Sequence, residues 1–288
     1  MSQPVLAHVH IAKAGGSTVR HLLRGSFGIR HCDVRTFDRS PFDARHFAQM
    51  RRAYPFGLRS ISGHALVQVG ARLGDAVLPF TFVRDPVARV ASAYQHHVRS
   101  TRRQKRGNPV SPLEDFVTWP QSRNRQVRQI AGSDDLAEAL RELEGYLFVG
   151  LLERFEESLQ LLAALSPYPL AAGYQVRNEA PDETEKQEIL RDPARRKLIE
   201  EANASDVPLY AHVRDVLYPA QQGRAERALA SGERARVLVR APGPRTSAFR
   251  ARVSRLYNQI FYRGLLLHPQ RSRVRRGEKR PWPGERPC

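Results

Sequence analysis

Residues 5–18 read VLAHVHIAKAGGST, and this stretch decides the fold class. Its apolar, β-branched first part, residues 5–11, is typical of a buried strand, and the paired glycines Gly15 and Gly16 predict a tight turn. The next residues, 19–24, have helical spacing, and Ser17 or Thr18 could cap that helix. The stretch therefore predicts a strand, a glycine turn and a helix.

The same order of elements recurs twice along the chain. An apolar run at 78–83 is followed by Arg-Asp-Pro and a helical stretch at 87–99, and Pro86 suits the first turn of a helix. A third apolar run at 146–152 precedes a helical stretch at 153–165. Strands that alternate with helices predict an α/β, P-loop-like three-layer fold with a central parallel sheet flanked by helices.

The charge of the chain is concentrated near its C-terminus. The 288 residues carry a net charge of +18, and residues 221–288 hold 17 of the 47 Lys and Arg but 4 of the 29 Asp and Glu. We therefore expect a catalytic domain at 1–220 and a basic, helical or disordered extension at 221–288. A hydrophobic fraction of 41% excludes a collagen, a coiled coil or a disordered chain as a description of the whole protein.

The positions of the cysteines and the hydropathy of the chain indicate its cellular compartment. Cys32 and Cys288 stand far apart in the sequence, which indicates neither a disulfide framework nor a zinc site. The N-terminus shows no secretory signal pattern, and no apolar run is long enough for a transmembrane helix. We expect a cytoplasmic protein, with peripheral membrane binding open as an addition.

The glycine turn has the features of an anion site. Backbone N–H groups at such a turn, together with a helix N-terminus, bind phosphate or sulfate groups. Lys13 adds a positive charge, and Ser17 and Thr18 add hydroxyl donors. In the common nucleotide triphosphate loop the lysine follows the last glycine, whereas here it precedes them, which disfavours an ordinary ATPase or kinase.

Two motifs in order carry a family resemblance. Residues 10–23, HIAKAGGSTVRHLL, and residues 82–94, FVRDPVARVASAY, resemble signatures of the carbohydrate sulfotransferase family that includes heparan sulfate 2-O-sulfotransferase. The resemblance implies the donor 3′-phosphoadenosine 5′-phosphosulfate and no metal. The residues it assigns to the donor are Lys13, Ala14, Gly15, Gly16, Ser17, Thr18, Arg84 and Ser92. Ala12 and Ala14 replace the proline and threonine of the signature, so we expect weaker donor binding.

Three weaker similarities extend the resemblance over residues 5–215. Ser62-Gly63-His64 lies where the family has a Gly-His pair whose histidine is the catalytic base. A stretch at 149–159, VGLLERFEESL, resembles a structural element of the family. An N-x-Q-x-R stretch supplies candidate substrate-binding residues, which are Asn124, Gln126 and Arg128.

The residue chemistry suits sulfuryl transfer to a hydroxyl of a carbohydrate or glycolipid. An in-line displacement of this kind depends on positioning and on charge stabilisation. His64 is the candidate base that takes the hydroxyl proton, since a neutral imidazole accepts a proton near pH 7. Lys13 is the second candidate catalytic residue, because it can neutralise charge on the departing phosphate oxygen. Among the other nine histidines, His8 and His10 are expected to pack on one face of a strand.

Other interpretations of the sequence stay open. The loop could belong to a nucleotide-dependent kinase with an atypical phosphate loop, and Arg84 could pair with Asp85 while Ser92 is a small packing residue. The basic extension could indicate a nucleic-acid-binding protein, which the balanced charge of residues 1–220 disfavours. The sequence does not indicate an oligomeric state.

Within the extension, residues 247–267 predict an amphipathic helix. Its apolar positions are Phe249, Val253, Leu256, Tyr257, Ile260 and Phe261. This face could dock on the catalytic domain, lie on an anionic membrane surface, or be part of a helix that guides an anionic glycan.

Overall fold

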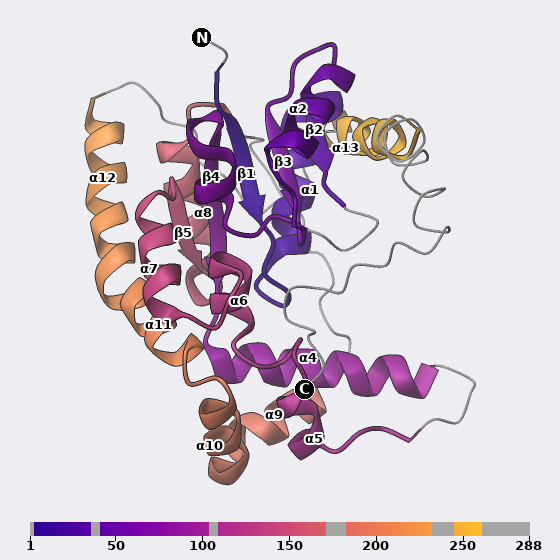
Figure 1. Cartoon of the computed structure of the whole chain (residues 1–288), viewed down its shortest axis with the longest axis vertical. Coiled ribbons are helices and arrows are strands. Elements are labelled where there is room, and N and C mark those ends of the chain that lie inside the picture. Colours follow the sequence, from indigo (N-terminus) through magenta and orange to yellow (C-terminus); the bar gives the residue numbers. More distant parts are fainter. Residues whose placement is uncertain (1–2, 36–40, 104–108, 171–182, 232–244, 261–288) are drawn as a thin grey trace.

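The computed structural model describes residues 3–35, 41–103, 109–170, 183–231 and 245–260. At its centre is a parallel sheet with the strand order β2-β3-β1-β4-β5 (Figure 1). The strands are β1 (Val5–Val9), β2 (His31–Asp33), β3 (Ser60–Gly63), β4 (Val77–Val83) and β5 (Phe148–Leu151). Helices flank this sheet, which confirms the predicted α/β class.

The helices follow the strands in an alternating order. They are α1 (Gly16–Phe27), α2 (Ala44–Ala53), α3 (Val69–Leu73), α4 (Pro86–Arg103), α5 (Leu113–Thr118), α6 (Arg125–Ala131), α7 (Leu136–Glu144), α8 (Phe155–Leu165), α9 (Thr184–Arg191), α10 (Pro193–Ala202), α11 (Asp206–His212), α12 (Tyr218–Ala230) and α13 (Arg245–Tyr257). Short 3-10 turns cover Gly28–Arg30, Gly74–Ala76 and Leu152–Arg154, and a wider π turn at Val213–Leu217 joins α11 to α12.

The sequence predictions hold for the long elements and fail at some of their ends. The predicted strand 5–11 ends at Val9, and the predicted strand 146–152 shortens to β5. Neither Ser17 nor Thr18 caps α1, because the helix already begins at Gly16 and the cap position is Gly15 in a left-handed conformation. The strands β2 and β3 were not predicted.

Burial explains why the central strands form. All five residues of β1 are buried, and six of the seven residues of β4 are. Strands that are covered on both faces read as continuous apolar runs, as these two do. A second apolar cluster joins α4 to α5, α9 and α10 through residues such as Val90, Phe116 and Ile199.

The helix α12 runs across residue 220, the predicted end of the catalytic domain. Its Gln221 side chain accepts a hydrogen bond from the Val149 N–H at 2.6 Å and donates one to the Val149 carbonyl at 3.3 Å. Tyr218 is fully buried, and its hydroxyl lies 3.1 Å from Ser158 Oγ. The start of the basic extension is therefore packed against β5 and α8.

The predicted amphipathic helix is present as α13, and its turns continue to residue 260. Residues 261–267 of the prediction lie outside the described residues. The helix packs against α1, and its buried residues are Ala251, Ser254 and Asn258. Of its predicted apolar positions, Tyr257 packs against the core, with 5.4 Å between its ring centroid and that of Tyr54. Phe249 and Leu256 stay exposed. Two of the buried residues, Ala251 and Ser254, are small, which suits the direct packing of α13 on α1.

Asn258 fixes the end of this helix to the sheet. Its side-chain carbonyl accepts hydrogen bonds from the Tyr54 hydroxyl and the Asp33 N–H, each at 3.3 Å. Its amide donates to the His31 carbonyl at 3.2 Å. Within the described ranges, no helix combines the length and the hydropathy that crossing a membrane requires.

A buried ion pair joins α4 to α11. The guanidinium of Arg89 lies 3.7 Å from the carboxylate of Asp206, and both side chains are almost fully buried. Asp206 also accepts the N–H groups of Gln126 and Val127, at the start of α6. Burial lowers the pKa of Arg89 to about 10 and raises the pKa of Asp206, so each charge depends on the other.

We predict that Arg89→Met lowers the free energy of unfolding by about 3–5 kcal/mol, because it leaves Asp206 buried without its cation. Chemical denaturation measures the change. The control is Lys197→Gln, which removes an exposed pair with Glu201 and should change the stability by about 0.5 kcal/mol or less. Equal stability of the two variants would contradict the structural role of Arg89.

Candidate active site

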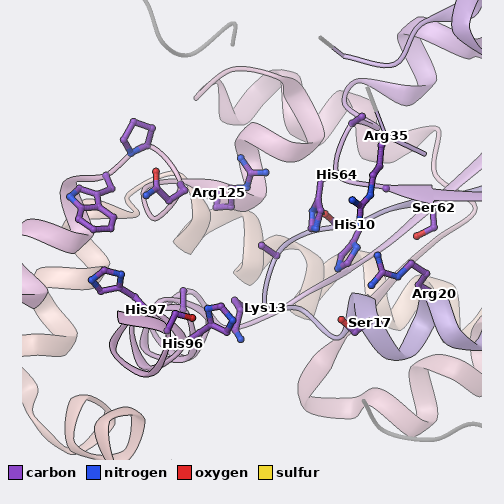
Figure 2. Close-up of a pocket in the computed structure, with 18 of the residues that line it drawn as sticks. His10, Lys13, Ser17, Arg20, Arg35, Ser62, His64, His96, His97 and Arg125 are labelled. Atoms are coloured by element: carbon purple, nitrogen blue, oxygen red, sulfur yellow. The ribbon is translucent and has the colours of Figure 1, made fainter. Parts of the chain in front are cut away.

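A cavity of about 1240 Å³ opens at the carboxyl edge of the sheet. Its walls come from the loop after β1, from the residues after β3, from α4, and from residues 116–125. Ligands of open α/β sheets bind at this edge. Figure 2 shows the cleft with His64, His10, Arg20 and Arg35 in one part of it, and Lys13, His96 and His97 in another.

The loop between β1 and α1 has an unusual backbone. Lys13 has a φ of +69° and Gly15 a φ of +79°, so both are left-handed. A left-handed non-glycine residue costs conformational energy and is found preferentially at functional sites. The Thr18 and Val19 N–H groups return to the Gly15 carbonyl, and the positive end of the α1 dipole lies at this turn. The loop therefore joins a left-handed backbone to the N-terminus of α1, and its role as an anion cradle stays a prediction.

A close approach explains the second glycine. A Cβ at Gly16 would stand 1.9 Å from the ring of His10, which no packing can accommodate. The His10 ring in turn stacks on His64, with 4.0 Å between the ring centroids. His10 follows the last residue of β1 and lines the cleft, and its ring stacks on His8 with 5.4 Å between the centroids, so the two histidines share one face as predicted. Gly16 and the rings of His10 and His64 form one packed column.

His64 is held with one ring nitrogen available for proton transfer. Its Nδ1 lies 2.7 Å from the His10 carbonyl oxygen, which can only accept, so Nδ1 carries the proton and Nε2 is the basic nitrogen. Gln129 donates to the His64 carbonyl at 3.0 Å and fixes the backbone. The His64 side chain lines the cavity and is exposed to it.

The electrostatics of the cleft keep His64 neutral. Burial, followed by the charges of Arg125, Arg20 and Arg35, lowers its pKa to about 4, against the opposing effect of the bond to His10. Burial and the nearby Arg84 also lower the pKa of Lys13. Near neutral pH the site therefore contains an unprotonated imidazole.

The cleft is strongly cationic. Among its described lining residues the only carboxylate is Asp33, which bonds Arg24 and His31. The Arg20 Nε is buried and has no acceptor within the described residues. A buried nitrogen of this kind indicates room for an anionic ligand. The lining cations are Lys13, Arg20, Arg35, Arg99, Arg103 and Arg125.

Arg84 lies beside the β1 loop, as the two motifs require. Its Nη1 donates to the Lys13 carbonyl at 3.2 Å. The Gln126 side chain brackets its backbone, accepting the Arg84 N–H at 2.9 Å and donating to the Arg84 carbonyl at 2.8 Å. Asp85 does not pair with Arg84 but caps α4 by accepting the Ala88 N–H. Arg84 itself is not among the residues that line the cavity.

The remaining candidate residues lie outside the cavity. Ser92 is half-buried two turns into α4. The Asn124 side chain accepts the Ser205 N–H at 3.1 Å, and Arg128 forms an ion pair with Asp134 at 2.9 Å. Asn124, Gln126 and Arg128 therefore support the loops around the cleft, while Arg125 between them reaches the cavity. The assignment of Asn124, Gln126 and Arg128 to substrate binding stays a prediction.

Comparison with known proteins agrees with this geometry. The sequence model of the sulfotransferase family matches residues 2–212, which is most of the chain. The chain belongs to the sulfotransferase family. An uncharacterised protein of Archaeoglobus fulgidus is 25% identical over 189 residues, which make up 56% of this chain and 73% of that protein. Membership assigns sulfuryl transfer as the general reaction.

The third motif of this sulfotransferase supports the first two. Leu152 and Phe155 pack against Gly15, at 2.8 and 3.2 Å from the position of an added Cβ. Glu153 accepts the Asp85 N–H at 3.0 Å. The segment after β5 therefore holds both the β1 loop and the β4 loop in place.

An aromatic wall faces the cationic part of the cleft. His97 and Trp119 meet edge to face with 5.0 Å between their ring centroids, and Phe116 lies 5.1 Å from Trp119. All three line the cavity. Sequence reasoning did not single out Trp119, Arg20, Arg35 or Arg125, because nothing in their local pattern shows that they converge.

We predict that Gly16→Ala displaces the His10 ring and, through it, His64. The thermal midpoint should fall, since the added methyl group overlaps a buried ring and forces a shift of the loop. Differential scanning calorimetry measures this change. Gly145→Ala is the matched control, because its Cβ would meet its nearest neighbour at an ordinary 3.6 Å. A Gly16→Ala protein as stable as Gly145→Ala would show that the column is not needed.

Proposed function

We propose that this sulfotransferase moves the sulfuryl group of 3′-phosphoadenosine 5′-phosphosulfate to a hydroxyl of a carbohydrate or glycolipid. We also propose that, within the sulfotransferase family, the protein belongs with the group that includes heparan sulfate 2-O-sulfotransferase. The observation that carries it is the neutral His64, with Nε2 available, in one cationic cleft with Lys13. A base and an anion cradle that line the same cavity are the two parts that this reaction needs.

The donor fits the residues at the loop. The turn at Gly15, the N-terminus of α1 and Lys13 provide the cradle for its 5′-phosphosulfate. The guanidinium of Arg84, next to Lys13, is the proposed partner of the 3′-phosphate, together with Ser92. We expect Ala12 and Ala14 to weaken this binding without abolishing it, because backbone N–H groups supply most of the cradle.

The proposed reaction is an in-line displacement at sulfur. His64 Nε2 takes the proton of the acceptor hydroxyl while the new S–O bond forms and the bond from sulfur to the phosphate oxygen breaks. Lys13 stabilises the negative charge on that leaving oxygen. Lysine and arginine supply the positive charge of the proposed site, so the scheme does not call for a metal ion.

The acceptor would lie between His64 and the aromatic wall. Figure 2 shows His97 at the side of the cleft away from His64, and the rings of Trp119 and Phe116 pack on His97 and add apolar surface to the cavity. The apolar faces of sugar rings pack on such surfaces. The six cations that line the cavity give it a positive potential, which favours an acceptor that is neutral or negatively charged. Which sugar and which hydroxyl are modified depends on contacts that the family does not fix.

The two other functions proposed from sequence now have less support. The family match assigns the loop to sulfuryl transfer rather than to an atypical kinase. Nucleic-acid binding through the basic extension is not tested by the fold, and it would be an addition to this activity. We retain sulfuryl transfer as the proposed function.

We predict that His64→Gln lowers kcat by about 100-fold or more, because the variant has no base for the hydroxyl proton. The assay follows labelled sulfate from the donor to a panel of glycans and glycolipids. His96→Gln, which removes another cleft histidine, is the matched control and should keep near-normal kcat. No transfer by the wild-type protein to any acceptor would overturn the proposed function, and full activity of His64→Gln would overturn the role of His64.

The same assay has a pH readout. Protonated His64 cannot accept a proton, so activity should fall as the pH drops through the pKa of His64. In kcat/KM that acid limb should lie near the free-enzyme value of about 4. In kcat it should lie higher, because a bound anionic donor offsets the arginines that hold the pKa down. His64→Gln should remove the limb.

We predict that Lys13→Ala and Arg84→Ala each weaken binding of adenosine 3′,5′-bisphosphate, the product of the donor, by about tenfold or more, since each removes a charge-assisted contact to phosphate. Isothermal calorimetry measures the dissociation constant. Lys197→Ala, an exposed cation on α10, is the control and should bind as the wild type does. Unchanged affinity in both cleft variants would place the donor elsewhere.

A further inference from the structure

The outer face of α13 is apolar and exposed. Phe249 is 67% exposed, Leu256 56% and Ile260 53%. Spacings of seven and four residues place these three side chains on one stripe of the helix. Of the seven large hydrophobic side chains that are exposed among the described residues, three are on this stripe. The stripe is therefore a concentrated feature rather than scattered surface exposure.

Docking on the body does not use this stripe. The helix contacts α1 through Ala251 and Ser254, and Asn258 anchors its end to β2. Together with the half-buried Tyr257, whose ring meets Tyr54 edge to face with 5.4 Å between the centroids, this small and polar face holds the helix in place. The apolar stripe thus remains available for a second environment.

Positive charge surrounds the stripe. Arg250, Arg252 and Arg255 are all exposed, and residues 245–260 contain no Asp or Glu. The sequence that follows, residues 261–288, adds eight Lys and Arg against two Glu. An apolar stripe flanked by arginines is the pattern of a helix that lies in a membrane interface.

A shallow groove extends the apolar surface beside the helix. It has a volume of about 820 Å³ and is lined by Phe249, Val253, Phe56, Tyr168 and Ile29. Phe56 is itself 62% exposed. The exposed apolar surface therefore continues from α13 to the loop that follows α2.

We propose that α13 binds the protein to an anionic lipid surface. Phe249, Leu256 and Ile260 enter the apolar part of the interface, and Arg250, Arg252 and Arg255 contact lipid phosphates or other anionic headgroups. The small face of α13 stays on α1, so the helix holds the catalytic body at the membrane surface.

The charge and the apolar area of the α13 surface favour a lipid bilayer over a second copy of the chain or a nucleic acid. A second copy would bring the same arginines against the first, which is unfavourable. Nucleic acid would satisfy the arginines but would leave the apolar stripe in water. An anionic bilayer satisfies both parts of the surface.

The test is vesicle flotation of the full chain. Phosphatidylcholine vesicles with phosphatidylglycerol should carry the protein, vesicles of phosphatidylcholine alone should carry much less of it, and high salt should weaken the binding. Phe249→Ser with Leu256→Ser should lower the vesicle affinity by about tenfold or more. Both side chains are exposed, so the melting temperature should not change.

The chain offers a matched control in Val216→Ser with Leu229→Ser. These two side chains are also exposed, but they lie in the turn before α12 and on α12, across the molecule from α13 (Figure 1). The control should float as the wild type does. Failure of the wild-type protein to float with anionic vesicles, or equal flotation of all variants, would overturn the proposal. So would a dimer, detected by light scattering, that the α13 substitutions dissociate.

Discussion

Parallel pairing of β1 with β3 and β4 is the constraint on which the site depends. Val9 is in register with Gly63 on one side and with Thr81 on the other, and the His10 N–H continues the ladder to the Gly63 carbonyl at 3.3 Å. Because parallel strands end at the same edge, the residues that follow these three strands must meet there. Lys13, His64 and Arg84 come from segments far apart in sequence and converge for this reason alone.

The loops at that edge are held by side chains that bond backbone groups. Gln126 brackets Arg84, Glu153 accepts the Asp85 N–H, and Gln129 holds the His64 carbonyl. An amide or a carboxylate in these places fixes the path of the main chain, so that the reactive side chains need not do so. The separate sequence motifs are therefore parts of one assembly. Its amide and carboxylate side chains set the positions of the segments that carry Lys13, His64 and Arg84.

The sequence predicted features that are local and missed those that arise from packing. The β1 loop, α4 and α8 follow from residues adjacent in the chain, whereas β2 and β3 are short and carry polar residues, so they lack the apolar pattern of a strand. Arg20 and Arg125 reach the cleft only because α1 and α6 turn them toward it. The periodicity of α13 identified a helix correctly but left the role of its apolar face open. In the structure Tyr257 of that face docks on the body, whereas Phe249 and Leu256 stay exposed. A close helix contact selects small residues, and periodicity of large apolar residues does not report them.

Several energetically unfavourable features of this fold lie in the cleft. Lys13 is left-handed, Arg20 has a buried nitrogen without an acceptor among the described residues, and six cations surround a single carboxylate. None of these arrangements stabilises the folded state, since each holds strain, an unmade hydrogen bond or repulsion between like charges. An anion in the cleft would relieve the last two together, by accepting from Arg20 and by offsetting the cations. Burial is the largest cause of the low pKa of His64, and the arginines add to it. An anion in the cleft would offset the arginine contribution and so raise that pKa.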